Sequence, residues 1–334
     1  MLRIPPARSS STMLKPLAAV FSALALLTAA PASRAQQVSI PPLIKIVVPF
    51  APSASTDVIA RSIAHQLGAR LGTNVIVDNR AGGSGMIGSN YAAKAPKDGS
   101  TLLFTSVSMV STAATTRMAP FDVTTDLVPI AIPGSGPLVI AVSSKTDIRT
   151  PADLVAAARA RPDQITHGTG GIGTIAHLAA ELLNDAAHVQ LKHVPYKGAS
   201  LAVTDASAGT IDMMIAVNTT FSAQIKAGRM RAIAVTSAKP SPAFPGLPPM
   251  ATVAPGYSVD LWTALFAPTG TPQPLIQRIN QEVNEIAKSR ELVELMQSDG
   301  ATPQAFTPEE AGNHVRESYA AWKRLAAAKN IVLE

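Results

Sequence analysis

The alternation of extended and helical patterns is the feature that most limits what this chain can fold into. Apolar runs of strand length, such as IKIVVPF (44–50), are followed by turns of small residues and then by helical periodicity, as in 57–71. Thr150, Pro151 and Asp153 form a helix start, with an N-cap, a proline at the first position and an acid in the first turn. The same order recurs in the second half, so we predict an α/β fold with largely parallel sheets.

A second feature suggests that the chain crosses between two lobes. A strand–glycine turn–helix unit occurs in each half, and the proline-dense segment 239–256 precedes the closing helical patterns. These patterns cover residues 272–288, 291–298 and 308–328. Two crossings would bring one glycine turn from each lobe to a shared cleft. We therefore predict one lobe from residues 36–136 and 258–334, and another from residues 137–257.

Two glycine motifs have the G-x-G-x-x-G spacing of a dinucleotide-binding turn, GSGMIG (83–88) and GTGGIG (168–173). A dinucleotide site needs this motif on the first strand–helix turn and an acid about 20 positions later, at the end of the next strand. The first motif follows the second strand instead, and the required position falls in an apolar strand near Leu102. The strand after the second motif ends in LKHVPY, without an acid. We therefore predict no dinucleotide and no other cofactor.

These turns are suited to holding a small anion. A helix N-terminus presents unpaired backbone N–H groups and about half a positive charge, and small residues before it allow close approach. The turns PSASTD (52–57) and HGTGGIGT (167–174) both have this form, and Thr174 adds a hydroxyl donor. The alternative is that Ser55 or Thr56 only caps its helix and that the glycines only make tight turns. Two such turns at corresponding positions favour a carboxylate site.

The N-terminal 35 residues have the features of a secretory signal: basic residues, an apolar run at 16–32, and Ser33 and Ala35 before a cleavage point. A membrane anchor is the alternative, but this run is shorter than the roughly 20 apolar residues that a span needs. Cleavage would leave 24 basic and 22 acidic residues, a net charge of +2 instead of +6. The basic excess therefore gives no support to nucleic-acid binding.

The chain has no cysteine, which excludes disulfides, thiolate catalysis and thiolate metal ligands. Export without disulfides is compatible with a bacterial periplasm, where a chain of this length can depend on a large core. We therefore predict a periplasmic protein, cleaved near Ala35, that does not bind nucleic acid.

No arrangement typical of an enzyme is present. His167, His177 and His193 lack metal-ligand spacing, and His177 is expected to pack or bond locally at the start of its helix. The G-x-S-x-G motif of hydrolases is absent. Asp57 could act as a general base, yet an acid in the first turn of a helix is favoured by the helix dipole alone. We predict neither enzymatic activity nor a metal site.

Across these motifs the sequence resembles the Bug family, the periplasmic solute-binding proteins of tripartite tricarboxylate transporters. The resemblance extends in order over almost the whole mature chain. The segments that carry it are IVVPFAPSASTDVIAR, VIVDNRAGGSGMIGSNYAAKAPKDGSTLLF, GTGGIGTIAHLAAELL, VPYKGASLAVTDASAGTIDMM, WTALFAPTGTP and TPEEAGNHVRESYAAW.

The resemblance implies a type II periplasmic-binding-protein fold, in which two α/β lobes close on a ligand. It also implies that the ligand carboxylate is held between the first strand–helix loop and the HGTGGIGT-type loop, often through ordered waters. The residues at these positions are Ser53, Ala54, Ser55, Thr56, Asp57, Gly170, Gly171, Gly173 and Thr174. Ser106 and Asn218 are further candidates, for the distal end of the ligand, and Asp57 could select ligands with an amino group.

One departure from the family pattern concerns the first loop, where proline is usually followed by two glycines. Ser53 and Ala54 stand at those positions here. If the positions require positive φ, these residues strain or reshape the loop, and the ligand would differ from the familiar di- and tricarboxylates.

The resemblance further predicts a monomer that delivers a small organic carboxylate to a large and a small membrane permease subunit. A sensory protein that presents the ligand to a receptor kinase would have the same fold and ligand chemistry, so this alternative remains open. A dinucleotide-dependent enzyme is the other alternative.

Overall fold

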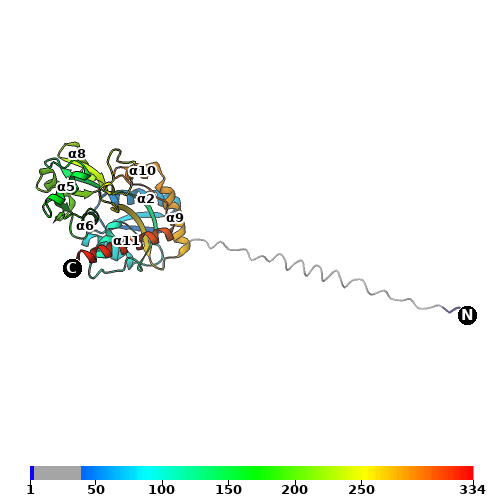
Figure 1. The fold of residues 1–334 in the computed structure, drawn as a ribbon. Coiled ribbons are helices and arrows are strands. Elements are labelled where there is room, and N and C mark those ends of the chain that lie inside the picture. The colour runs from blue at the N-terminus through cyan, green and yellow to red at the C-terminus, as the bar shows by residue number, and fades with distance from the viewer. Residues whose placement is uncertain (4–38, 334) are drawn as a thin grey trace. The chain divides into compact units, whose positions relative to one another are not determined.

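The computed structural model describes residues 1–3 and 39–333 of the chain. The predicted signal peptide, apart from residues 1–3, and its cleavage site near Ala35 lie outside the described residues. Residues from Ser39 onward form one structural unit, built from two β-sheets with helices packed on them (Figure 1). Within the described ranges, no helix is long and apolar enough to cross a membrane.

The first sheet has six strands in the order β11-β4-β10-β3-β1-β2. Its strands are β1 (Leu43–Val48), β2 (Asn74–Asn79), β3 (Thr101–Ser106), β4 (Leu127–Pro137), β10 (Asp260–Pro268) and β11 (Thr302–Pro303). Its helical segments are α2 (Ser55–Leu71), the short 3-10 turn η1 (Gly83–Gly85), α3 (Met86–Ala93), α4 (Val107–Thr115), α9 (Gln273–Ala287), α10 (Arg290–Gln297) and α11 (Pro308–Ala328). In Figure 1, α2, α9 and α10 lie together on the side away from α5 and α8.

The second sheet has five strands in the order β7-β6-β8-β5-β9. Its strands are β5 (Val139–Ser143), β6 (Thr166–Thr169), β7 (Lys192–Pro195), β8 (Met213–Ala216) and β9 (Met230–Val235). Its helices are α5 (Pro151–Ala160), α6 (Ile175–Ala187), α7 (Ala199–Ala208) and α8 (Asn218–Lys226). The predicted start of α5 is confirmed, because Thr150 and Asp153 form a reciprocal capping box with Pro151 in the first turn.

The strand pairings are mixed, which corrects the prediction of largely parallel sheets. In the first sheet β1 pairs in parallel with β2 and β3, but β10 is antiparallel to both β3 and β4. In the second sheet β5 is antiparallel to its neighbours β8 and β9. Strands β5 and β10 are those at which the chain enters a sheet from the other one and not through a strand–helix–strand unit. The short strand β11 is also antiparallel to its neighbour β4.

Thr236 links the two crossing segments of the chain. Its fully buried hydroxyl accepts the N–H of Leu138 at 2.8 Å and donates to the carbonyl of Val259 at 2.6 Å. Backbone hydrogen bonds from Thr236 to Leu138 and from Val259 to Thr236 complete the link. The connection from β4 to β5 and the connection from β9 to β10 are therefore joined at one buried point.

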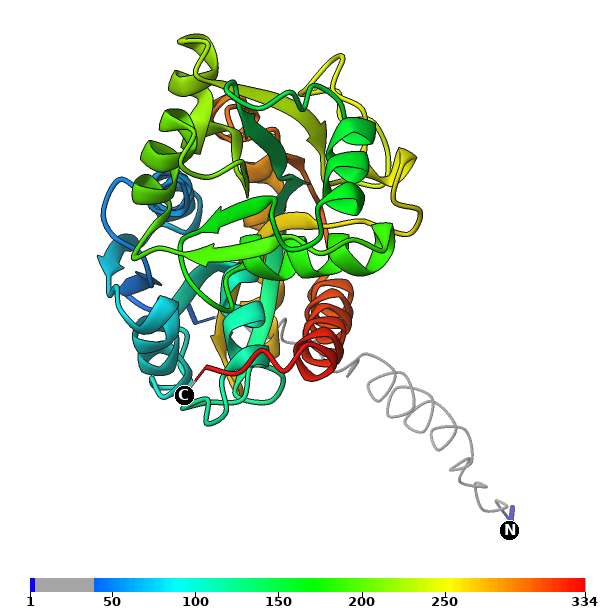
Figure 2. The ribbon, with the colours of Figure 1, turned by 60° about the vertical axis from the view of Figure 1, so that its left-hand side comes forward.

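Helix α11 also connects the two halves. It packs against α4 of the first half and α6 of the second, and Figure 2 shows it in red beside these segments. Val315 and Leu325 on its inner face belong to the same buried apolar cluster as Leu178 and Leu183 of α6. The apolar core is thus continuous from one half to the other.

The segment PGSG (133–136) extends β4 and does not break it. A β-carbon on Gly136 would lie 2.6 Å from the Cα of Ala301, so glycine allows the α10–β11 segment to pass directly over the strand. A β-carbon on Gly134 would lie 2.3 Å from the sulfur of Met296. Helix α4 directly follows β3, at a segment for which the sequence patterns predict no helix.

Candidate functional site

Two adjoining cavities form a continuous cleft, because they share Val217 and Leu261 as lining residues. The first cavity has a volume of about 750 Å³ and the second about 580 Å³, and both volumes include space open to solvent. The first is lined by Phe50, Ala54, Ser55, Thr56, Ile59, Ser106, Ser108, Gly134, Val217, Leu261, Thr263, Met296, Asp299 and Ala301. The second is lined by Leu138, Thr169, Gly170, Thr174, Ile175, Ala176, Ala199, Met214, Ile215, Ala216, Val217, Thr220 and Leu261.

Helix starts from both halves face this cleft. The first cavity is lined by the starts of α2 and α4, and the second by the starts of α6, α7 and α8. No lysine, arginine or histidine is among the lining residues drawn from the described chain. The donors that the cleft offers to an anion are therefore backbone N–H groups at helix starts, together with hydroxyl groups.

The first-half turn is held by a network around Asp57, which is buried and does not line either cavity. Its carboxylate accepts hydrogen bonds from the N–H of Ser53 at 2.8 Å, Nε of Arg61 at 3.0 Å and Nδ2 of Asn79 at 2.8 Å. Burial raises the pKa of Asp57, but these hydrogen bonds outweigh it and hold the pKa below its usual range. Asp57 is thus ionised and engaged within the protein.

Ser53 and Ala54, which stand where the family usually has two glycines, adopt different backbone conformations. Ser53 has φ of +66°, in the left-handed region that glycine adopts readily. Ala54 has φ of −63° and is the N-cap of α2, without a side-chain hydrogen bond to the first turn. Strain is therefore confined to Ser53, while Ala54 lines the first cavity and exposes the start of α2 to it.

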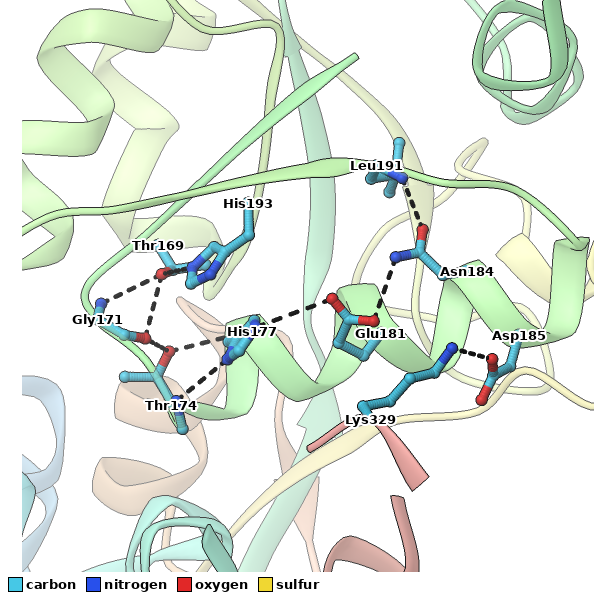
Figure 3. A network of polar contacts seen from close by, with 11 residues as sticks. Thr169, Gly171, Thr174, His177, Glu181, Asn184, Asp185, Leu191, His193 and Lys329 are labelled. Atoms are coloured by element: carbon cyan, nitrogen blue, oxygen red, sulfur yellow. Dashed lines mark hydrogen bonds and ion pairs between the residues drawn. The ribbon is translucent and has the colours of Figure 1, made fainter. Parts of the chain in front are cut away.

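In the second half, hydroxyl groups of the turn at 167–174 stabilise the turn itself (Figure 3). Thr174 is the N-cap of α6; its Oγ1 donates to the carbonyl of Gly171 at 2.8 Å and accepts the N–H of His177 at 3.4 Å. Gly171 and Gly173 have φ of +138° and +75°. A β-carbon on Gly173 would lie 2.6 Å from Oγ1 of Thr115, so close packing on the first half also requires glycine there.

Three histidines lie beneath this turn. The rings of His177 and His193 stack with centroids 3.9 Å apart, and His167 lies 5.7 Å from His193. Burial lowers the pKa of His177 and of His193 to about 4 each, and the pKa of His167 to about 3. These rings are neutral at pH 7, and the expected local bonding of His177 is found, because its Nδ1 accepts the N–H of Gly173 at 3.1 Å.

The predicted site residues divide into two groups. Ala54, Ser55, Thr56 and Ser106 line the first cavity, and Gly170 and Thr174 line the second. The residues that line neither cavity are Ser53, Asp57, Gly171, Gly173 and Asn218. Nδ2 of Asn218 donates instead to the carbonyl of Ser298 at 3.2 Å.

Asp299 is a charged lining residue that no sequence pattern predicts. One carboxylate oxygen accepts from Oγ of Ser55 at 2.6 Å, and the other accepts from Oγ1 of Thr219 at 2.5 Å. Ser55 begins α2 of the first half and Thr219 lies in the first turn of α8 of the second half. No motif surrounds Asp299, and the contact with Ser55 joins positions 244 residues apart, so only the folded chain brings it to the cleft.

The arrangement defines a class of protein: two α/β halves joined by two crossings, with a cleft between them that is lined by helix starts and hydroxyl groups. Residues 59–331 match the family described as the tripartite tricarboxylate transporter family receptor. The chain belongs to this family, which confirms the resemblance to the Bug proteins and the predicted fold class.

Curated relatives and a solved structure are similar over most of their lengths. The UPF0065 protein of the tcbD-tcbE intergenic region of Pseudomonas sp. (strain P51) is 37% identical, covering 92% of each chain. Protein BugT of Bordetella pertussis is 35% identical, covering 84% of this chain and 86% of its own. A structure of an R. palustris protein with adipate is 31% identical, with a TM-score of 0.77 and coverage of 87% of this chain and 98% of its own.

Proposed function

We propose that this protein is an exported, non-enzymatic solute-binding protein. It captures a small organic carboxylate in the cleft and delivers it to the large and small permease subunits of a tripartite tricarboxylate-type transporter. The single observation that carries this proposal is the convergence of five helix starts, from both sheets, on one continuous cleft whose lining has no cationic side chain.

The energetics of such a site are sufficient for a useful affinity. A hydrogen bond to a charged group contributes roughly 1.5–3 kcal/mol, so four such bonds contribute about 6–12 kcal/mol. Association costs at least about 4 kcal/mol, and micromolar affinity requires about 8 kcal/mol. Burial of the ligand carbon skeleton against Phe50, Val217 and Leu261 supplies the remainder.

The proposed lobe boundaries are residues 36–136 with 258–334, and residues 137–257. They are supported by the sheets, because β5 to β9 fall within the second range and the strands of the first sheet, apart from Pro137 of β4, fall within the first. In this proposal the ligand is held between the turns at 53–57 and 170–174 when the lobes close, with its carboxylate at the start of α6. The protein acts as a monomer in the periplasm, after cleavage near Ala35.

A ligand screen tests the proposal. Purified protein without residues 1–35 is heated with aliphatic organic acids, aromatic acids and amino acids, and titration calorimetry then measures the acids that raise the melting temperature. A ligand at one hundred times its Kd stabilises the folded state by about 2.7 kcal/mol. The amide of each acid that binds serves as the control, since it keeps the carbon skeleton and lacks the charge.

Two results would contradict the proposal. Equal stabilisation by an acid and its amide would show that the charge is not recognised, and tight binding of NAD or FAD would favour a dinucleotide-dependent enzyme. Uptake of the identified acid by cells that contain the permease subunits, with and without this protein, separates transport from a sensory role.

A further inference from the structure

Asp299 places a negative charge inside a cleft that otherwise favours anions. It is the only charged side chain among the lining residues of the two cavities in the described chain. It lies in the loop between α10 and β11, and its exposed fraction is 8%. A carboxylate in this position needs partners within the protein, and both of its oxygens have them.

The partners of Asp299 are donors that a ligand carboxylate would otherwise use. Oγ of Ser55 and Oγ1 of Thr219 each have a single hydrogen to donate, and both hydrogens are directed at Asp299. The backbone N–H of Thr219, in the first turn of α8, lies 3.3 Å from the same carboxylate. The α2 end of the cleft is therefore already occupied by an anion that belongs to the chain.

The opposite end of the cleft differs from this one. The second cavity has no acidic lining residue within the described chain, and Gly170, Thr174 and Ala176 bring the start of α6 to it. Apolar groups at Phe50, Ile59, Val217, Leu261 and Met296 lie along the wall of the first cavity. The cleft thus offers an anion-binding end, an apolar wall and an end that carries negative charge.

We infer that Asp299 determines specificity: it excludes a second carboxylate from the α2 end of the cleft and favours a ligand whose far end carries a hydroxyl or amino group. This inference rests on the proposed function, in which one carboxylate binds at the α6 end. A second carboxylate would meet Asp299 at short range in a partly buried site and would compete for the same two hydroxyl donors. A hydroxyl or ammonium group would instead donate to Asp299.

The experiment uses four acids with the same six-carbon skeleton: hexanoate, 6-hydroxyhexanoate, 6-aminohexanoate and adipate. Titration calorimetry at pH 7 compares the wild type with Asp299→Asn. In the wild type we expect the hydroxy and amino acids to bind at least tenfold more tightly than adipate. In Asp299→Asn we expect the affinity for adipate to rise at least tenfold, that for 6-aminohexanoate to fall at least tenfold, and that for hexanoate to change less than threefold.

Glu294→Gln is the matched control, because it removes the same charge from the neighbouring helix α10, where Glu294 is exposed and pairs with Arg290. Its ligand preference should equal that of the wild type. Circular dichroism and thermal unfolding check that each variant folds, and Asp299→Ala, which removes the charge and its three hydrogen bonds, should show the same change of preference.

The possible failures are distinguishable. If wild type and Asp299→Asn bind these acids with the same order of preference, the inference is overturned and the proposed function stands. If neither these acids nor any acid in the wider screen binds to the wild type, the proposed function is overturned and the inference falls with it.

Discussion

The backbone N–H of Gly173 donates a hydrogen bond to Nδ1 of His177, 3.1 Å away, and this fixes the ring as neutral with its proton on Nε2. Nε2 lies 3.8 Å from Oε1 of Glu181. If Nδ1 were protonated, its N–H would face the N–H of Gly173, and this hydrogen bond would be lost. The second-half turn is therefore built on the neutral form of a buried histidine.

Stability should consequently fall as the solution is acidified. The pKa values of His177 and His193 are lowered by burial to about 4, and the pKa of His167 to about 3. The unfolded chain, with histidine pKa values near 6.5, binds more protons below that pH, so stability is complete above about pH 6.5 and is lost as pH falls toward 4. Urea unfolding at several values from pH 7 to pH 4.5 measures this loss.

A single substitution should reduce the pH dependence. His177→Asn keeps an acceptor near Nδ1 but does not titrate, so we expect the slope to decrease by up to roughly 1.4 kcal/mol per pH unit. His65→Gln, at an exposed position of α2, is the control and should leave the slope unchanged. An unaltered slope in His177→Asn would show that the buried ring does not cause the acid sensitivity.

Two substitutions of Thr174 distinguish the contribution of its hydroxyl from that of its backbone N–H at the start of α6. Thr174→Val removes the N-cap hydroxyl and should cost about 1 kcal/mol of stability. Thr174→Pro also removes the N–H, while the observed φ of −66° already fits a proline ring. We expect the proline variant to bind the identified acid more weakly than the valine variant. Equal affinities by calorimetry would mean that the N–H of Thr174 does not contact the ligand.

Ser53 should be more stable as glycine. The left-handed conformation costs a residue with a β-carbon roughly 1–2 kcal/mol, and glycine loses part of that gain through its greater freedom in the unfolded chain. We expect Ser53→Gly to raise the free energy of unfolding by up to about 1 kcal/mol. Ser53→Ala, which removes the hydroxyl and retains the β-carbon, should give no increase. A gain of the same size in both variants would exclude backbone strain as the cause.

Asp57 should act on stability and not on ligand preference. Asp57→Asn removes the charge that faces Arg61 and weakens the hydrogen bonds from Ser53 and Asn79. We expect a loss of about 1–3 kcal/mol in urea unfolding, with the order of ligand affinities retained. A changed preference for ligands with an amino group, without a loss of stability, would assign Asp57 to the ligand instead.

The local elements of the fold were predictable because their signals are local. Helices α9, α10 and α11 lie within one residue of the ranges that periodicity predicts. The exception is α4, whose residues VSMVSTAAT are small or β-branched apart from Met109, so no periodic apolar face marks the helix. It forms because it is buried between the halves, a condition that no short window of sequence contains.

The candidate site was predictable only where a single turn forms it. Thr174 and Ala54 stand at helix starts that the sequence marks directly. Asp299 reaches the cleft because β11 pairs with β4, and that pairing depends on the close passage over Gly136. Contacts of this kind arise from tertiary packing and leave no local pattern.

The buried hydroxyl of Thr236, finally, restricts how the cleft can open. Leu138 and Val259 are both hydrogen-bonded to it, so in the proposed closure of the lobes the two connections would bend together, with Thr236 at the hinge. The displacement of each lobe would then increase with distance from Thr236. In the proposed closure, small backbone rotations beside Thr236 would produce larger displacements at the starts of α2 and α6.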